Sequence, residues 1–406
     1  MTSKLQHNRN RTSRVGAAAL AWGLAIGPAM LATPSAAAQT FKLLYAFTGG
    51  ADGGGPWGTP LLSGGDIYCT TFYGGGPSHA GTVFEYLLSP PAGFPIYAFA
   101  GQPNDGAAPM SGLVTDGFGD FFGTTTQGGF GQHGILYEIS QGTELVVQIF
   151  NGPDGETPEG NLLIDQAGDL YGTTSQGGAN DSGTVFAFSG SGGGFIELHS
   201  FGNGAGDGVG PASGVVLQLL QSNGDLVLYG TTTEGGAHSW GTVFSVNLKT
   251  KAETVLYSFH GGKDGGTPAG GLVLDAKGDL YGTTSAGGSA NGTAGNGVVF
   301  KLNIRSHRYS LVHTFTGADG SQPLATLLPD GKGNFYGTTY VGGAHGYGTV
   351  FQLNSAGALT TLYNFTNGTD GAYPYAGLAM DSSGNFYGTA TGGGQYGWGT
   401  LFEITP

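Results

Sequence analysis

Tyr171-Gly172-Thr173-Thr174 is one of seven near-copies of a tetrapeptide in this sequence of 406 residues. The other copies begin at Tyr68, Phe122, Tyr229, Tyr281, Tyr336 and Tyr387. Successive copies start 49 to 58 residues apart. A period near 50 residues is typical of architectures in which each repeat is one supersecondary unit packed against its neighbours. The sequence therefore predicts seven such units.

Each period contains four short apolar runs between turn-forming residues. In the fourth period these runs are Gly214–Leu219, Leu228–Thr232, Gly241–Val246 and Thr254–Phe259. Runs of β-branched and aromatic residues bounded by Gly, Asn and Asp predict strands. Four antiparallel strands in a period of this length predict one blade of a β-propeller.

The two ends of the repeat region predict how the ring closes. A fourth-strand sequence, Leu44–Phe47, precedes the first complete set of strands, and the last run, Gly399–Ile404, is a third strand. An N-terminal strand that completes the last blade would leave no strand edge exposed. We therefore predict an all-β fold, a single seven-bladed β-propeller over residues 39–406, with four antiparallel strands per blade.

The first 38 residues have the pattern of a secretory signal peptide. A basic segment is followed by an apolar run over residues 15–31 and by the small residues Ala36–Ala38. This order predicts cleavage before Gln39, secretion to the periplasm or the medium, and no membrane span in the mature protein. The basic residues of the segment are Lys4, Arg9, Arg11 and Arg14.

Composition excludes some classes of partner. The whole chain has a net charge of −14, and loss of the four basic residues of the signal peptide would make the mature protein more acidic. Nucleic acids and anionic membranes require a basic surface, so neither is expected as a partner. The single cysteine, Cys69, excludes an internal disulfide, and its place in a predicted strand predicts a small buried side chain. We expect a monomer.

An aspartate recurs in the turn between the first two strands. A tight hairpin in which the carboxylate accepts local amide hydrogen bonds explains this pattern. A structural calcium ion is the alternative, but the hairpin needs no ion, so we expect no cofactor. The turn aspartates are Asp116, Asp165, Asp275, Asp330 and Asp381.

The loop from the fourth strand of one blade to the first strand of the next reads Asp-Gly-x-x-Pro in all seven repeats. In one interpretation the aspartates form a ring of carboxylates at the mouth of the channel, where they could hold cations. In the other, which regular repetition favours, each caps its own turn. These residues are Asp52, Asp105, Asp154, Asp207, Asp264, Asp319 and Asp370.

The loop between the second and third strands lies on the same face and differs from blade to blade. Varied loops on a rigid scaffold often carry binding groups, and histidines beside aromatic rings suit stacking on sugars and bonding to their hydroxyls. The alternative is that each aromatic covers the gap between two blades. The candidate ligand-binding residues are Trp57, His79, His133, His238, Trp240, His345, Tyr347, Tyr396 and Trp398. Because these histidines fall on separate blades without chelating spacing, no metal site is predicted.

The combination of Leu170–Thr174, Gly177-Gly178 and Gly183–Phe186 resembles the Gloeo_Verruco (GloVer) tandem repeat of exported bacterial proteins. The resemblance extends over residues 41–406 and implies an extracellular or surface-associated repeat protein, without catalytic residues to carry over. Relatives often bear a C-terminal anchoring segment. This sequence ends at Pro406, directly after its last strand, so release is expected.

The sequence lacks the usual catalytic signatures, among them the G-x-S-x-G elbow, the P-loop and the dinucleotide fingerprint. We therefore expect a binding module for an extracellular glycan or another surface ligand, without chemistry of its own. Two alternatives stay open: a structural or protein-interaction scaffold of the cell envelope, and a polysaccharide hydrolase or lyase that uses the loop face.

Overall fold

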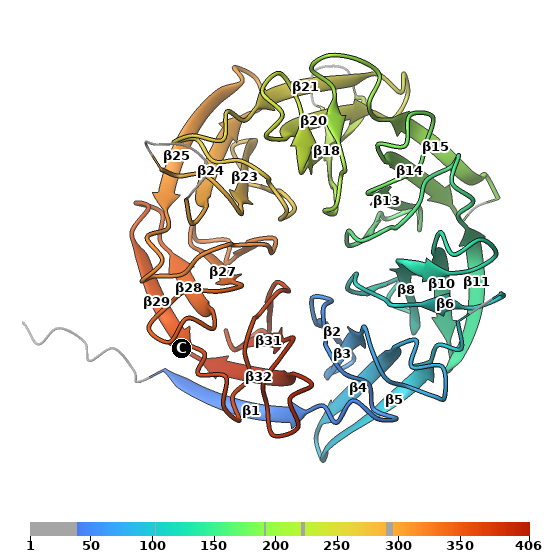
Figure 1. Cartoon of the computed structure of the whole chain (residues 1–406). Coiled ribbons are helices and arrows are strands. Elements are labelled where there is room, and N and C mark those ends of the chain that lie inside the picture. Colours follow the sequence, from blue (N-terminus) through green and yellow to red (C-terminus); the bar gives the residue numbers. More distant parts are fainter. Residues whose placement is uncertain (1–38, 102, 191, 221–223, 290–294) are drawn as a thin grey trace, which may run out of the picture. The chain divides into compact units, whose positions relative to one another are not determined.

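The computed structural model describes residues 39–406 except 102, 191, 221–223 and 290–294. The predicted signal peptide, residues 1–38, lies outside the described residues. Seven antiparallel four-stranded sheets form a ring (Figure 1), and the described residues contain no α-helix. This confirms the predicted seven-bladed β-propeller.

The first four blades follow the chain in order. Blade 1 contains β2 (Leu61–Ser63), β3 (Asp66–Thr71), β4 (Thr82–Leu88) and β5 (Pro91–Ala98). Blade 2 contains β7 (Val114–Thr115), β8 (Asp120–Thr125), β10 (Ile135–Ser140) and β11 (Thr143–Ile149). Blade 3 contains β12 (Leu163–Ile164), β13 (Leu170–Thr174), β14 (Thr184–Ser189) and β15 (Gly194–Ser200). Blade 4 contains β17 (Val216–Leu219), β18 (Leu226–Thr232), β20 (Thr242–Asn247) and β21 (Glu253–Ser258).

The last three blades complete the ring. Blade 5 contains β22 (Val273–Leu274), β23 (Asp279–Thr284), β24 (Val298–Asn303) and β25 (Arg308–Thr314). Blade 6 contains β26 (Leu328–Pro329), β27 (Phe335–Thr339), β28 (Thr349–Leu353) and β29 (Leu359–Asn364). Blade 7 contains β30 (Ala379–Met380), β31 (Phe386–Ala390), β32 (Thr400–Thr405) and β1 (Thr40–Ala46).

The N-terminal strand closes the ring as predicted. β1 pairs antiparallel with β32, from Thr40 opposite Thr405 to Ala46 opposite Thr400. Figure 1 shows β1 as the outermost strand of the blade that holds the last three strands of the chain. The first and last parts of the repeat region are therefore held in one sheet, and β32 is paired on both sides instead of forming an edge.

The inner strands are shorter than the sequence predicts. The apolar run Gly214–Leu219 forms a strand only over Val216–Leu219, and the inner strand of blades 2, 3, 5, 6 and 7 has two residues. At Gly214 the chain comes too close to the neighbouring blade for a side chain: a Cβ there would lie 2.6 Å from the carbonyl oxygen of Asn161. The chain there contacts other blades rather than extending its own sheet.

The repeated tetrapeptide is scaffold, and each of its positions has a packing role in blade 3. Gly172 makes room for the third strand, because a Cβ there would lie 2.5 Å from Cζ of Phe186. The hydroxyl of Thr173 donates to the carbonyl oxygen of Ser213 in the next blade at 2.8 Å. The hydroxyl of Thr174 lies 2.9 Å from that of Thr184 and so joins the second and third strands.

The hydrophobic core lies between blades rather than in one central mass. Val243 and Phe259 of blade 4 pack in one cluster with Leu272, Leu280 and Phe300 of blade 5, and all are buried. The rings of Phe259 and Phe300 are 5.2 Å apart and nearly perpendicular. Each such layer buries apolar area that a single blade would leave exposed, so the blades stabilise one another.

The first-turn aspartates and Cys69 have the local structure that the sequence predicts. In blade 3 the carboxylate of Asp165 accepts the amides of Ala167 at 2.8 Å and Asp169 at 3.0 Å, which closes the hairpin. Cys69 replaces the repeat's glycine inside a strand and is fully buried. Burial raises the pKa of its thiol to about 12, so the group stays protonated and unreactive at neutral pH.

Candidate functional site

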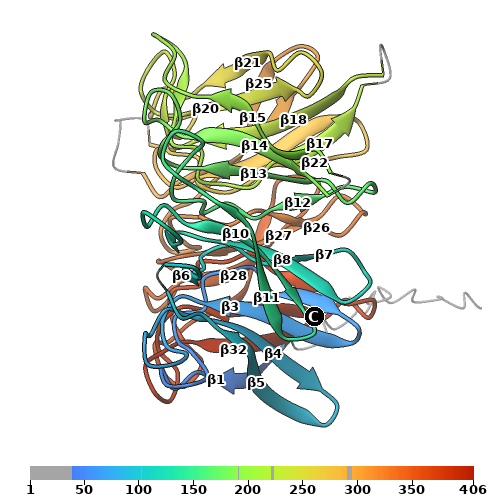
Figure 2. The ribbon, with the colours of Figure 1, turned by 90° about the vertical axis from the view of Figure 1, so that its right-hand side faces the viewer.

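One face of the ring, here called the loop face, is built from two sets of loops that pair with each other. In each blade the Asp-Gly-x-x-Pro loop forms backbone bridges to the loop that follows the second strand. In blade 2 these are β6 (Gly106–Ala107) and β9 (Gln127–Gly128), and in blade 4 they are β16 (Gly208–Val209) and β19 (Glu234–Gly235). Figure 2 shows the ring from the side, with β6 among these loops. The pairing gives the varied loops a fixed base.

The other five blades use single bridges for the same purpose. They join Gly54 to Tyr73, Glu156 to Gln176, Gly266 to Ala286, Ser321 to Val341, and Ala372 to Gly392.

The aspartates of the Asp-Gly-x-x-Pro loops are bonded locally and to the outermost strand. In blade 7 the carboxylate of Asp370 accepts the amides of Thr366 at 2.8 Å and Gly368 at 3.1 Å, and the hydroxyl of Tyr363 at 3.1 Å. All seven accept an amide from three to five residues upstream, from Thr48, Ala100, Asn151, Asn203, His260, Thr316 and Thr366. Because Tyr363 and its equivalents are on the outermost strands, these carboxylates lie over the outer part of each blade. None of them lines the central opening.

The residue after the conserved proline lines the central opening instead. These seven positions differ in kind: Trp57, Met110, Glu159, Ala212, Ala269, Leu324 and Tyr375. The cavity that they border holds about 50 Å³. Pockets that enclose small ligands are typically several hundred Å³, so the opening is too small to take up a sugar ring.

A constriction closes the channel just below these residues. Asn161 accepts the amide of Gly112 at 2.6 Å, and the hydroxyl of Thr59 accepts the amide of Gly377 at 3.1 Å. On the far side of this layer a separate cavity of about 320 Å³ is lined mostly by leucine and glycine. A ligand on the loop face would therefore lie across the opening rather than pass through it.

Among the described residues that line the opening, Glu159 carries the one carboxyl group. Its Oε1 accepts the hydroxyl of Ser175 at 3.2 Å. Burial raises the pKa of Glu159, and the hydroxyl of Ser175 partly offsets this rise. Burial, with the nearby charge of Glu159, also raises the pKa of Tyr375 to about 12, so this hydroxyl is a hydrogen-bond donor at neutral pH.

Aromatic rings run without interruption from the opening to the rim of the loop face across blades 6, 7 and 1. We call this set the aromatic arc: Tyr347, Tyr373, Tyr340, Tyr375, Trp57, Phe72, Tyr73 and Trp398. Neighbouring ring centroids along it are 4.5–6.2 Å apart, with Trp57 and Tyr375 the closest pair at 4.5 Å. At the rim Tyr73 is 46% and Trp398 is 42% exposed. The arc thus combines a partly buried centre with an exposed end.

The arc contains three of the predicted binding residues, Trp57, Tyr347 and Trp398. Sequence reasoning missed its other five members, which are Phe72, Tyr73, Tyr340, Tyr373 and Tyr375. Two of the five could have been found because they depart from the repeat. The residue directly after the Thr-Thr pair is Ser or Thr in most blades, but it is Phe72 in blade 1 and Tyr340 in blade 6. Tyr396, which was also predicted, precedes Trp398 by two residues. It is 52% exposed and lies near Tyr45.

The structure does not bring the four predicted histidines together. His79 and His345 are exposed in blades 1 and 6. His133 in blade 2 lies 3.1 Å from Glu156, and the ring of His238 in blade 4 stacks on that of His260 at 3.9 Å. The four remain on separate blades and form no common site.

Trp240 and Trp398 occupy equivalent positions, and each covers a turn of the next blade. A Cβ on Gly261 would lie 2.4 Å from the ring of Trp240, and a Cβ on Gly49 would lie 2.4 Å from the ring of Trp398. Both rings therefore lie flat against a glycine turn, which is the gap-covering role considered as the alternative for these residues. Only Trp398 also contacts other rings of the loop face, at Tyr73.

The ring architecture has distant structural relatives. Two are extracellular domains of proteins described as hybrid two-component systems from B. thetaiotaomicron, at 13% and 11% identity with TM-scores of 0.55 and 0.57. Each match covers 90% of this chain, which spans about two fifths of those proteins: 41% and 42%. An oligogalacturonate lyase from Vibrio parahaemolyticus is 9% identical with a TM-score of 0.53, covering 91% of this chain and 97% of the lyase. At these identities the likeness shows the fold alone.

No curated protein matches the sequence significantly. None of the described residues forms a helix long and apolar enough to cross a membrane. The Gloeobacter/Verrucomicrobia repeat family matches residues 96–293 and 289–406, well over half of the chain. Together with the seven blades built on the repeated tetrapeptide, this match shows that the protein belongs to the Gloeobacter/Verrucomicrobia repeat family.

Proposed function

We propose that this protein is an exported binding module whose aromatic arc holds a neutral glycan on the loop face. The arc is the observation that carries the proposal. Aromatic side chains bind the apolar face of a ligand ring by stacking against it. Tyrosine and tryptophan suit this role because each combines a large apolar surface with a polar group at its tip. A pyranose ring has both an apolar face and hydroxyl groups that these tips can bond.

The shape of the site favours a chain lying across the surface. Because the central cavity holds only about 50 Å³, an enclosed monosaccharide would not fit. A run of rings 4.5–6.2 Å apart that ends at the half-exposed Trp398 instead offers successive contacts to an extended oligosaccharide. Weak single contacts along one chain add to a useful affinity.

Charge favours a neutral glycan over an acidic one. The described residues that line the opening include no lysine or arginine, and the carboxyl of Glu159 stands next to Tyr375 at the centre of the arc. The whole chain carries a net charge of −14. Both features would repel a polyuronate, whereas a neutral glycan would experience no such repulsion.

Binding without cleavage is the function that the site supports best. Glycosidases use two carboxyl groups placed on either side of the scissile bond. Glu159 is the one carboxyl among the described residues that line the opening, so the site offers one such group and not two. The extracellular domains among the structural relatives and the family's repeat support an exported module that binds or scaffolds.

Calorimetric titration with a panel of oligosaccharides tests the proposal. Neutral glucans, xylans and mannans are compared with polygalacturonate of similar length. We expect at least one neutral glycan to bind and polygalacturonate not to bind, and Tyr375→Ala to weaken binding by about tenfold through loss of one stacking contact. Absence of binding to every neutral glycan, or unchanged affinity in the Tyr375 variant, would contradict it.

A further inference from the structure

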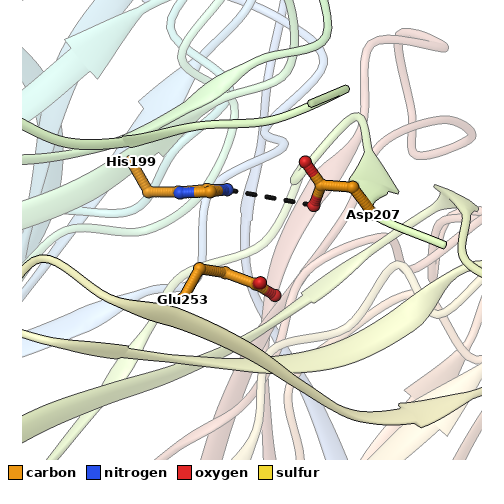
Figure 3. Close-up of side chains that lie close together, drawn as sticks. All are labelled: His199, Asp207 and Glu253. Atoms are coloured by element: carbon orange, nitrogen blue, oxygen red, sulfur yellow. Dashed lines mark ion pairs between the residues drawn. The ribbon is translucent and has the colours of Figure 1, made fainter. Parts of the chain in front are cut away.

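His199, Asp207 and Glu253 converge between blades 3 and 4, on the outer side of the ring. His199 is on β15, Asp207 directly precedes β16, and Glu253 is the first residue of β21. One side-chain ligand atom of each lies within 4.8 Å of the other two. Figure 3 shows the imidazole of His199 and the carboxylates of Asp207 and Glu253 directed into the same space.

The same three positions meet between other blades, and the junction of blades 4 and 5 shows contacts that need no ion. Tyr257 stacks on Tyr309 at 4.6 Å, and both hydroxyls donate to Asp264, at 2.9 Å to its carboxylate and at 2.8 Å to its backbone oxygen. Elsewhere Tyr363 stacks on Phe41 at 4.2 Å. Not every junction uses tyrosine: Gln148 donates to Asp154 at 3.0 Å, and Nε2 of His313 lies 2.9 Å from the carboxylate of Asp319. The repeat therefore closes this junction with an aromatic pair, a tyrosine hydroxyl, a glutamine or a paired histidine.

The closest counterpart also contains a glutamate but is bridged. Between blades 1 and 2 the hydroxyl of Tyr97 lies 3.0 Å from Asp105 and 3.2 Å from Glu144. This hydroxyl sits between the two carboxyl groups and accounts for their proximity, although the other carboxylate oxygen of Glu144, Oε1, is also buried without a hydrogen-bond partner among the described residues. In the junction of blades 3 and 4 the tyrosine is replaced by His199, and no hydroxyl takes its place.

The His199 junction is left with unpaired polar atoms. Nε2 of His199 lies 3.8 Å from Oδ1 of Asp207, which is too long for a hydrogen bond. Nε2 of His199 and one carboxylate oxygen of Glu253, Oε1, are both buried and have no hydrogen-bond partner among the described residues. Buried polar atoms without partners typically cost about 1–3 kcal/mol each, so two of them aimed at one point indicate a missing partner.

The nearby lysine does not supply that partner. Nζ of Lys251 donates to the backbone oxygen of Glu197 at 3.0 Å instead. The described ion pairs of Asp207 and Glu253 include no lysine or arginine. Two carboxylates and an imidazole without a cation are the donor set of a site for a divalent metal.

Two of the three ligands are already held in place by their surroundings. The carboxylate of Asp207 accepts the amides of Asn203 at 2.8 Å and Gly208 at 2.7 Å. The ring of His199 is fixed edge-on against Phe201, with centroids 4.7 Å apart. Hydrogen bonds and packing of this kind orient metal ligands before the ion arrives.

We propose that His199, Asp207 and Glu253 bind a zinc ion that joins blades 3 and 4. One imidazole nitrogen and two carboxylate oxygens suit zinc better than calcium, which prefers six to eight oxygen ligands. In a tetrahedral zinc site the ligand atoms are about 3.3 Å apart, as follows from bonds of about 2.0–2.1 Å. The 3.8 Å separation of His199 and Asp207 needs to close by only a fraction of an ångström. The three ligand atoms lie within 4.8 Å of one another, so zinc binding requires the other separations to shorten by at most about 1.5 Å.

Titration of the full chain, without an affinity tag and stripped with a chelator, tests this site with Zn²⁺ alone. We expect one zinc ion per chain, a rise in melting temperature on zinc addition, and four-coordinate visible absorption when Co²⁺ replaces zinc. His199→Gln and Glu253→Gln should each weaken the binding by about tenfold or more, since changing only a residue that hydrogen-bonds to a metal ligand costs about ten- to a hundredfold.

Glu144→Gln is the matched control, because it alters the equivalent glutamate at the bridged junction and should leave zinc binding unchanged. Melting curves of all three variants without metal show whether each is folded, so a loss of binding is interpreted only for a folded variant. Failure of the wild type to bind zinc, or binding that His199→Gln and Glu253→Gln leave unchanged, would overturn the proposal. An equal loss in the Glu144 control would overturn it as well.

Discussion

Trp57 and Tyr375 occupy the same position after the conserved proline in blades 1 and 7, and their ring centroids meet at 4.5 Å. In five other blades this position holds Met110, Glu159, Ala212, Ala269 or Leu324, so the aromatic pair is particular to one side of the opening. A scaffold residue would be expected to repeat, as the tetrapeptide does. This local departure from the repeat is why we assign binding to the arc and structure to the tetrapeptide.

The glycine of the tetrapeptide is a steric requirement, which Gly172→Ala tests. The added Cβ would lie 2.5 Å from Phe186 and 2.9 Å from Leu162, both in the core. Overpacking of this kind typically costs about 1–3 kcal/mol, and we expect a loss of about 2 kcal/mol in urea unfolding. Gly76→Ala is the control, because its Cβ would meet nothing within 4 Å. Equal free energies of unfolding for the two variants would show that the strands accommodate the added Cβ at Gly172 without losing stability.

The first threonine of the tetrapeptide joins neighbouring blades, which Thr173→Val tests. The substitution removes the hydroxyl that donates to Ser213 at 2.8 Å and leaves a buried carbonyl oxygen unpaired. We expect a loss of about 1–2 kcal/mol in the free energy of unfolding. Thr389 has the equivalent position in blade 7, but its buried hydroxyl has no partner among the described residues.

Thr389→Val therefore serves as the control for Thr173→Val. It removes a hydroxyl that makes no bond, and we expect a change within about 0.5 kcal/mol in either direction. Chemical denaturation of both variants gives the comparison. If Thr389→Val destabilised the protein as much as Thr173→Val, the inter-blade hydrogen bond would not be the cause.

Glu144 predicts a dependence of stability on pH. Burial, and next the charge of Asp105, raise the pKa of Glu144 to about 8. Between about pH 4.5 and about pH 8 the folded protein therefore binds more protons at this group than the unfolded chain does. The stability that comes from protonated Glu144 is fully present below about pH 4.5 and is lost as the pH rises through about 8.

Glu144→Gln mimics the protonated carboxyl and removes this loss. We expect the variant to match the wild type near about pH 5 and to be more stable by about 1 kcal/mol near about pH 8.5, a figure reduced because the group is partly exposed. Urea unfolding at the two pH values measures the difference. The exposed Glu234→Gln controls for the change in net charge. A stability difference independent of pH would be inconsistent with a raised pKa.

The repeat made the fold predictable. Seven copies of one tetrapeptide, with Leu44–Phe47 before the first full set and Gly399–Ile404 after the last, predicted the blade number and the β1–β32 closure. The inner strands were predicted too long, because apolar runs do not show how tightly the chain is packed near the axis. The close approach of Gly214 to Asn161, from another blade, decides where pairing stops.

The sites were less predictable because their contacts cross blade boundaries. Trp57, Tyr347 and Trp398 were identified as residues that differ between repeats, but no spacing in the sequence shows that their rings meet through Tyr373, Tyr375 and Tyr73. No spacing in the sequence indicates the cluster of His199, Asp207 and Glu253, since 46 positions and a blade boundary separate Asp207 from Glu253. Its one trace is that His199 stands where four other blades have tyrosine, but His313 occupies the same position in blade 5, where it pairs with Asp319 alone.

The most direct test of the binding role of the arc compares Trp398 with Trp240. Both rings lie on a glycine turn of the next blade, but of the two only Trp398 belongs to the arc, through its contact with Tyr73. Calorimetry with the tightest-binding neutral oligosaccharide should show affinity weakened about tenfold in Trp398→Ala, and within about twofold of wild type in Trp240→Ala. Equal affinities in the two variants would contradict the assignment of glycan binding to the arc.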